Sequence, residues 1–148
     1  MIYIARNLLK QMIEHSQRGF PNEACGILAG KVGNVDTSTS LSVNGERSRT
    51  VEKVYEMINT EKSPSTFFME PKEQLKVMKE IRSLGLEMIG IYHSHVASLA
   101  YPSAHDIEMA FYPEVSYVII SIKDQDHPII RSFRIEEGKI TEEEVRIE

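Results

Sequence analysis

The stretch LEMIGIYHSH, residues 86–95, is apolar except for Glu87 until it reaches two histidines. A short apolar run that follows a turn residue, here Gly85, predicts a buried strand, so His93 and His95 would lie where that strand ends. Alternate residues of a strand point to the same side, and their Cα atoms lie about 6.6 Å apart at a rise of ~3.3 Å per residue. Both imidazoles can therefore reach one metal ion at distances of about 2.0–2.1 Å.

A third ligand follows in Asp106, whose carboxylate would leave a fourth position open for water. Three protein ligands with an open position are typical of catalytic zinc sites, whereas structural sites have four protein ligands. Each residue also has a structural explanation. His-x-His pairs occur as ordinary polar residues, and Ser103 with Asp106 three positions later is typical of a helix N-cap. Glu23, which precedes an apolar strand, can equally be a solvated carboxylate.

Composition narrows the class of protein. A chain of 148 residues with 41% hydrophobic and 26% charged residues is expected to form one domain, residues 1–148, with its own core. The net charge of −5 and the lack of a basic cluster disfavour nucleic acid as a partner. A single cysteine, Cys25, cannot form an internal disulfide. With no long apolar run and no signal-peptide pattern, we expect no membrane association and a cytoplasmic protein.

Hydrophobic periodicity and turn residues predict alternating helices and strands. Helices are expected over residues 6–17, from Pro71 to Gly85, and over 103–111. Strands are expected over 24–31, 51–58, 86–92, 115–122, 129–135 and 140–147, with loops over 33–48 and 59–66 and a hairpin turn near Gly138. The fold class is therefore α/β (α+β), with a curved mixed β-sheet flanked by helices. The pattern leaves the strand order open.

Together, these residues resemble the JAMM motif of the MPN (Mov34) metallopeptidase family. The motif is His-x-His, seven residues, Ser, two residues and Asp, which matches His93-Ser94-His95, Ser103 and Asp106. The upstream segment PNEACGIL, residues 21–28, is similar to the family strand that carries a glutamate. The resemblance extends over nearly the whole chain, and the compact prokaryotic branch is the most similar one.

The resemblance implies an MPN/JAMM (cytidine-deaminase-like) fold and one Zn²⁺ per chain, held by His93, His95 and Asp106. It implies that Glu23 is the general base and that Ser103 stabilises the oxyanion. The substrate would be a ubiquitin-like or sulfur-carrier protein, cut after its C-terminal Gly-Gly, with residues 59–69 guiding the tail. Those residues can also be an ordinary surface connection.

One position departs from the family, which usually has proline after the second histidine where this chain has Val96. Proline is not a ligand, so metal binding should survive, but the loop that leads to Ser103 loses a stiffening residue.

Other functions are weighed against the peptidase. A non-catalytic scaffold of the same fold is the main alternative, although such relatives lack several motif residues. DNA-associated relatives commonly have Asn between the histidines, where this chain has Ser94. A cysteine protease is disfavoured because Cys25 has no activating partner in the sequence. A nucleobase deaminase is disfavoured because its Pro-Cys-x-x-Cys pattern is absent. The identity of the modifier and the oligomeric state stay open.

Overall fold

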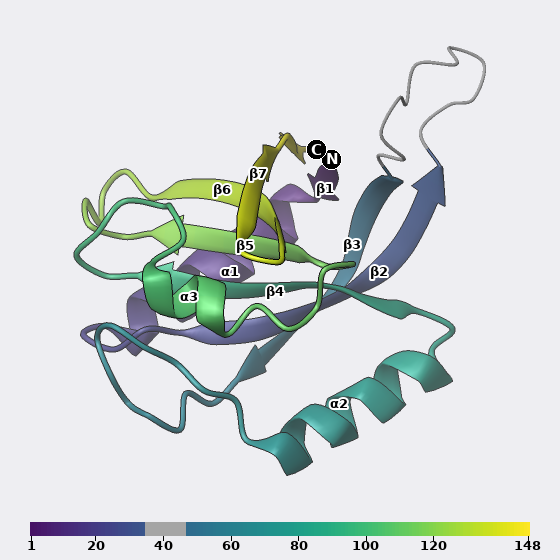
Figure 1. The fold of residues 1–148 in the computed structure, drawn as a ribbon, viewed down its shortest axis with the longest axis horizontal. Coiled ribbons are helices and arrows are strands. Elements are labelled where there is room, and N and C mark those ends of the chain that lie inside the picture. The colour runs from purple at the N-terminus through teal and green to yellow at the C-terminus, as the bar shows by residue number, and fades with distance from the viewer. Residues whose placement is uncertain (35–46) are drawn as a thin grey trace.

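The computed structural model describes residues 1–34 and 47–148. This part of the chain forms eight strands and three helices (Figure 1). The strands are β1 (Ile2–Ile4), β2 (Cys25–Asn34), β3 (Arg47–Met57), β4 (Glu87–His95), β5 (Ser116–Ser121), β6 (Ile129–Glu136), β7 (Lys139–Glu143) and β8 (Val145–Ile147). The helices are α1 (Arg6–Gly19), α2 (Pro71–Ser83) and α3 (Ala104–Glu108). The predicted α+β class is confirmed.

All eight strands belong to one mixed sheet, in the order β7-β6-β5-β4-β2-β3-β1-β8. At its centre, β4 pairs antiparallel with β2 and parallel with β5. The strands β7 and β8 occupy opposite edges, yet only Glu144 separates them in the chain. The sheet must therefore curl until its edges approach each other, which gives the nearly barrel-shaped form in Figure 1.

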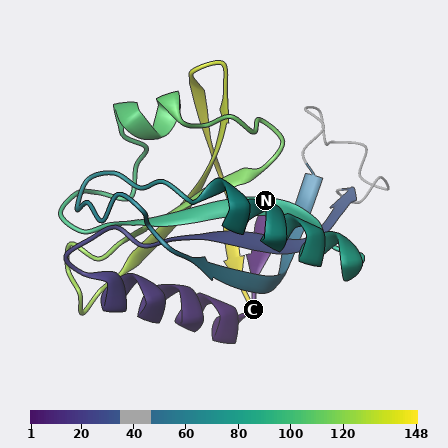
Figure 2. The ribbon, with the colours of Figure 1, turned by 90° about the horizontal axis from the view of Figure 1, so that it is seen from below.

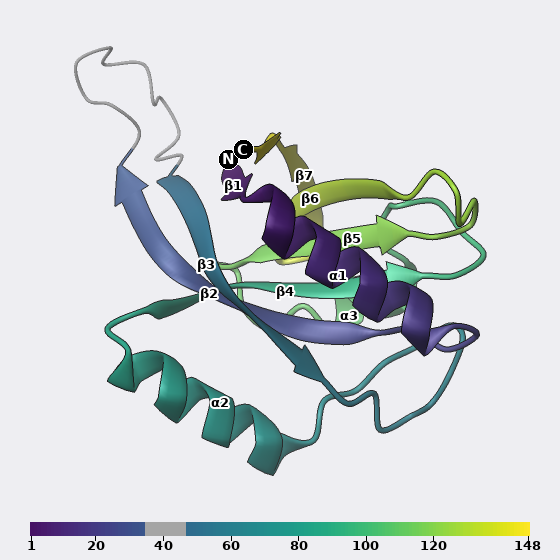
Figure 3. The same cartoon turned by 180° about the vertical axis from the view of Figure 1, so that it is seen from behind.

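Helices cover the two faces of this sheet differently. Figures 2 and 3 show α1 on one face, while α2 and α3 lie on the other. Successive residues of a strand point to opposite faces, so β4 contributes to both layers. Tyr92 packs with Met12 of α1, whereas Ile91 packs on the α2 and α3 side. By the same alternation, His93 and His95 face the α2 and α3 side.

Close packing at the centre of the sheet depends on Gly26. A Cβ atom at this position would lie 2.1 Å from Cε1 of Tyr92 and 2.5 Å from the carbonyl oxygen of Tyr55. The Tyr92 ring, which is fully buried, therefore occupies the space that any larger residue would need. This packing fixes β2 against β4 just before the histidines.

Two predicted elements have wrong boundaries. The third helix ends at Glu108 instead of Phe111, because a short segment gains little from helix cooperativity. The single strand predicted over 140–147 is divided into β7 and β8, which pair with β6 and β1. Strand β1 was not predicted. Most of the predicted loop over 33–48 lies outside the described residues, although its ends belong to β2 and β3.

The remaining predicted helices and strands are present with small shifts at their ends. Within the described part of the chain, no helix has both the length and the apolar character required to cross a membrane.

Candidate metal centre

The two histidines of β4 lie at the end of the central strand and point to the same face. Both side chains are almost fully buried, each residue being 3% exposed. Ser94, between them, points the other way, and its hydroxyl accepts a hydrogen bond of 2.8 Å from the backbone N–H of Ala24. A second bond of 2.9 Å joins the Ser94 N–H to the Ala24 carbonyl. The strand end that carries the histidines is thus tied to the segment that carries Glu23.

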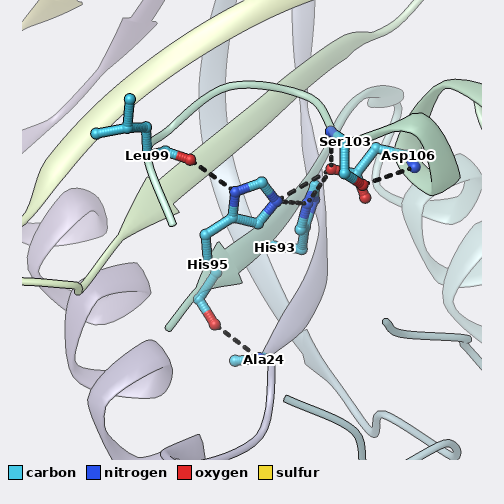
Figure 4. Close-up of polar contacts among 7 residues, drawn as sticks. Ala24, His93, His95, Leu99, Ser103 and Asp106 are labelled. Atoms are coloured by element: carbon cyan, nitrogen blue, oxygen red, sulfur yellow. Dashed lines mark hydrogen bonds and ion pairs between the residues drawn. The ribbon is translucent and has the colours of Figure 1, made fainter. Parts of the chain in front are cut away.

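Three atoms converge in front of this strand end. The Nε2 atoms of His93 and His95 lie 3.0 Å apart, and Oδ2 of Asp106 lies 3.2 Å and 3.0 Å from them, respectively (Figure 4). Ligands of a tetrahedral zinc ion at bonds of about 2.0–2.2 Å are separated by about 3.3–3.5 Å. Small side-chain shifts would therefore admit an ion, and the three residues form a buried group that could hold a metal.

Hydrogen bonding orients the His95 ring for this purpose. Its Nδ1 lies 2.7 Å from the carbonyl oxygen of Leu99, and a carbonyl can only accept, so Nδ1–H is the donor. In the neutral ring, Nε2 then presents its lone pair to Asp106, an arrangement that a cation stabilises. Phe67 stacks on His93 with the ring centroids 4.7 Å apart, and this contact holds the His93 imidazole in place.

Asp106 is supplied by the first turn of α3. The Ser103 hydroxyl accepts a bond of 3.1 Å from the Asp106 N–H, and Oδ2 of Asp106 accepts one of 2.9 Å from the Ser103 N–H. This reciprocal capping box starts the helix and also aims the carboxylate at the histidines. Ser103 is therefore an N-cap, as its spacing predicted. Because capping uses its oxygen as an acceptor, the hydroxyl hydrogen stays free to donate to another group.

Electrostatics suit the donor set to a cation. Burial raises the pKa of Asp106, but hydrogen bonds with His93 and His95 outweigh burial and hold the pKa well below its usual value. Burial lowers the pKa of His93 and favours the neutral ring. Burial also acts to lower the pKa of His95, yet hydrogen bonds with Asp106 and Leu99 raise it. A raised pKa favours a second proton on the His95 ring. A bound metal would take the place of that proton, because imidazoles that ligate a metal are neutral.

Glu23 lies on the same face as the three candidate ligands. Cys25, the first residue of β2, is paired with His93 of β4. Because the two strands are antiparallel, Glu23, two residues before Cys25, lies opposite His95, two residues after His93. The residue is 4% exposed, and its Oε1 atom has no hydrogen-bond partner among the described residues. Burial raises its pKa to about 8, with His95 opposing and Asp106 adding to the shift. Glu23 is thus a buried carboxyl beside the group, without a direct bond to it.

A cavity lies beside the three candidate ligands. It has a volume of about 230 Å³ and reaches from His93 and Asp106 to the aromatic residues Phe67, Phe68 and Phe111. Two aromatic pairs, residues 67–68 and 111–112, are visible in the sequence, but spacing alone could not show that they meet.

Three other predictions concern neighbouring residues. Cys25 is fully buried, and burial raises its pKa to about 12, so it is a poor nucleophile. Among the described residues, the group that could hold a metal does not include His105. Val96 packs against the core on the α1 side, and the Ser121 hydroxyl donates a bond of 2.7 Å to the Ser98 carbonyl. Packing and hydrogen bonds therefore anchor this loop without the usual proline.

Comparisons with known proteins agree with this geometry. The chain is 35% identical over 147 residues to the CysO-cysteine peptidase of Mycobacterium tuberculosis, covering 99% of this chain and 91% of that protein. It is 31% identical over 140 residues to a probable TtuB-protein conjugate cleaving protease of Thermus thermophilus, covering 94% and 79%. It is also 35% identical over 127 residues to a desampylase of Pyrococcus furiosus, covering 85% and 76%. Their names are those of a peptidase, a probable protease and a desampylase.

Solved structures extend the likeness to the fold. A protein of Desulfitobacterium hafniense shares 37% identity at a TM-score of 0.83, covering 100% of this chain and 93% of that one. A JAB1/MPN domain protein of Archaeoglobus fulgidus shares the fold at a TM-score of 0.57 and 18% identity, covering 98% and 97%. The family described as prokaryotic homologs of the JAB domain matches residues 5–136. Together with the group of two β4 histidines and the α3 aspartate, this match shows that the chain belongs to the prokaryotic JAB (JAB/MPN) domain family.

Proposed function

We propose that this protein is a zinc-dependent peptidase of the JAMM type. It hydrolyses the bond after the C-terminal Gly-Gly of a ubiquitin-like or sulfur-carrier protein. The observation that carries the proposal is the convergence of one carboxylate and two imidazole atoms within 3.2 Å at a buried strand end. Relatives named for conjugate cleavage support the choice of substrate.

The residues divide the chemistry between them. A zinc ion held by His93, His95 and Asp106 would polarise the scissile carbonyl and acidify water. Glu23 takes a proton from the attacking water and returns it to the leaving amine. A carboxyl whose pKa burial raises to about 8 can hold that proton between the two steps. The free hydroxyl hydrogen of Ser103 is donated to the developing oxyanion, a contribution worth about 3 kcal/mol in other enzymes.

The substrate tail would enter along residues 59–69. Asn59 and Met69 form an antiparallel bridge that closes this segment, and Phe67 and Phe68 line the cavity beside the ligands. An extended tail can pair with such a segment through backbone hydrogen bonds, as in β-strand addition. Glycine suits the last positions because it has no side chain to exclude from a narrow cleft.

The proposal is tested with small-modifier fusions that carry different C-terminal extensions, with the products identified by mass spectrometry. Cleavage after Gly-Gly, lost when bulky residues replace the glycines, is the expected result. Equal cleavage of both tails would refute the Gly-Gly preference.

A non-catalytic scaffold is the second candidate, and bound metal separates the two functions. One zinc per purified chain, absent after His93→Ala, supports the peptidase. A wild-type chain that binds no zinc would favour the scaffold.

A further inference from the structure

The side-chain amide of Asn59 uses all of its hydrogen-bonding capacity. Its Nδ2 donates to the carbonyl oxygens of Glu23 and Thr66, both at 3.0 Å. Its Oδ1 accepts from the N–H groups of Glu61 at 3.1 Å and Phe68 at 3.2 Å. An amide has two donors and one oxygen with two lone pairs, so nothing is left unused. Since both partners of the nitrogen can only accept, the orientation of the amide is fixed.

Through these bonds, Asn59 joins both ends of the 59–69 segment to Glu23. The backbone N–H of Glu23 donates to the Ser63 carbonyl at 2.9 Å, so both peptide groups of Glu23 are bound to this segment. Ala24, the next residue, is bound to Ser94 on the metal-site strand. Glu23 is therefore held between β4 on one side and residues 59–69 on the other.

The carboxyl of Glu23 has no comparable support of its own. Its Oε1 atom is buried and lacks a hydrogen-bond partner among the described residues, so backbone contacts set its position. A general base must lie within about 2.6–3.2 Å of the proton that it takes. A small displacement of the Glu23 backbone would therefore move the carboxyl out of reach of that proton and lower the rate of catalysis.

From these contacts, we propose that Asn59 is a positioning residue that holds Glu23 in register with the metal site. The inference rests on the proposed function, because it concerns the base of that reaction. It adds that residues 59–69, which border the substrate, form one hydrogen-bonded unit with the proposed base Glu23.

The test compares two nearly isosteric variants of neighbouring residues. Asn59→Asp removes both donors and places a carboxylate oxygen against the carbonyls of Glu23 and Thr66. Thr60→Val removes only the 3.0 Å bond from the Thr60 hydroxyl to the Phe68 carbonyl and leaves the backbone bond of 2.9 Å between the same residues. Thr60→Val therefore loosens the same segment without touching Glu23.

We expect kcat of Asn59→Asp to fall about 100-fold, the effect of a misplacement of ~1 Å in other enzymes. Its zinc affinity should stay close to wild type. Because both residues lie in the segment that borders the substrate, we expect KM to rise in both variants, whereas kcat should fall in Asn59→Asp and stay near the wild-type value in Thr60→Val. An Asn59→Asp variant with unchanged kcat, with only a raised KM, or with lost zinc would overturn the proposal.

A second readout does not need activity. Amide hydrogen exchange at the Glu23 N–H should accelerate in Asn59→Asp and not in Thr60→Val, and equal exchange would refute the role. If Asn59→Asp does not fold, Asn59→Ser replaces it, because a hydroxyl cannot donate to two carbonyls at once. A wild-type chain that cuts no Gly-Gly fusion would overturn the proposed function. The exchange comparison would still decide whether Asn59 holds Glu23.

Discussion

Replacing Glu23 with glutamine should stabilise the metal-free protein at alkaline pH. In the folded chain, burial raises the pKa of Glu23 to about 8 from its usual value of 4.5. Below pH 4.5 the carboxyl is protonated in both the folded and the unfolded state, so it does not affect stability. As pH rises from 4.5 to 8, the unfolded state ionises first, and the free energy of unfolding falls. Above pH 8 the loss is complete. Glutamine cannot ionise and avoids this loss.

The size of the effect follows from the shift. A displacement from 4.5 to about 8 corresponds to at most ~5 kcal/mol. Water and counterions that reach the site screen part of this penalty, so we expect Glu23→Gln to be more stable by about 2 kcal/mol at pH 9. At pH 4.5 the two proteins should differ little.

Urea unfolding at 25 °C in the presence of a chelator measures this difference at both pH values. Glu52→Gln, which removes a carboxylate from an exposed position of β3, is the matched control and should change stability by less than about 0.5 kcal/mol. In zinc-loaded protein the gain in unfolding free energy of Glu23→Gln should shrink, because a nearby cation favours the carboxylate.

The same variant should retain zinc and lose nearly all turnover. Equal stability of Glu23→Gln and wild type at pH 9 would show that the carboxyl is not in a desolvated site.

Three further predictions follow from the site and its packing. Zinc at 100 times its Kd should stabilise the wild type by about 2.7 kcal/mol in thermal unfolding, and His93→Ala should remove this gain; stabilisation of both proteins alike would contradict the ligand set. Gly26→Ala should cost about 3 kcal/mol in urea unfolding, because its Cβ would lie 2.1 Å from the Tyr92 ring, whereas Gly33→Ala, whose Cβ would have one near neighbour among the described residues, Ser48 Oγ at 3.1 Å, should cost far less. Cys25, whose pKa burial raises to about 12, should resist alkylation at pH 8 until the chain unfolds, and rapid labelling of the folded protein would argue against its burial.

Local sequence patterns predicted the elements that depend on neighbouring residues. The apolar run before His93 predicted a buried strand, and β4 ends at His95. Ser103 and Asp106 predicted an N-cap, and the capping box is present. Alternation along a strand placed both imidazoles on one face. Each of these features arises from residues a few positions apart, so short-range backbone geometry is sufficient to determine it.

The tertiary structure decided everything that depends on distant partners. The division of residues 140–147 between two sheet edges follows from pairing with β6 and β1, which local periodicity does not encode. The pKa of Glu23 depends on burial by segments far away in the chain, and the hydrogen bond from Asn59 to the Glu23 carbonyl joins residues 36 positions apart. Desolvation and long-range hydrogen bonds exist only once the sheet has curled and brought these segments together. The sequence alone therefore predicted the candidate ligands, whereas their enclosure and the support of Glu23 are properties of the folded chain.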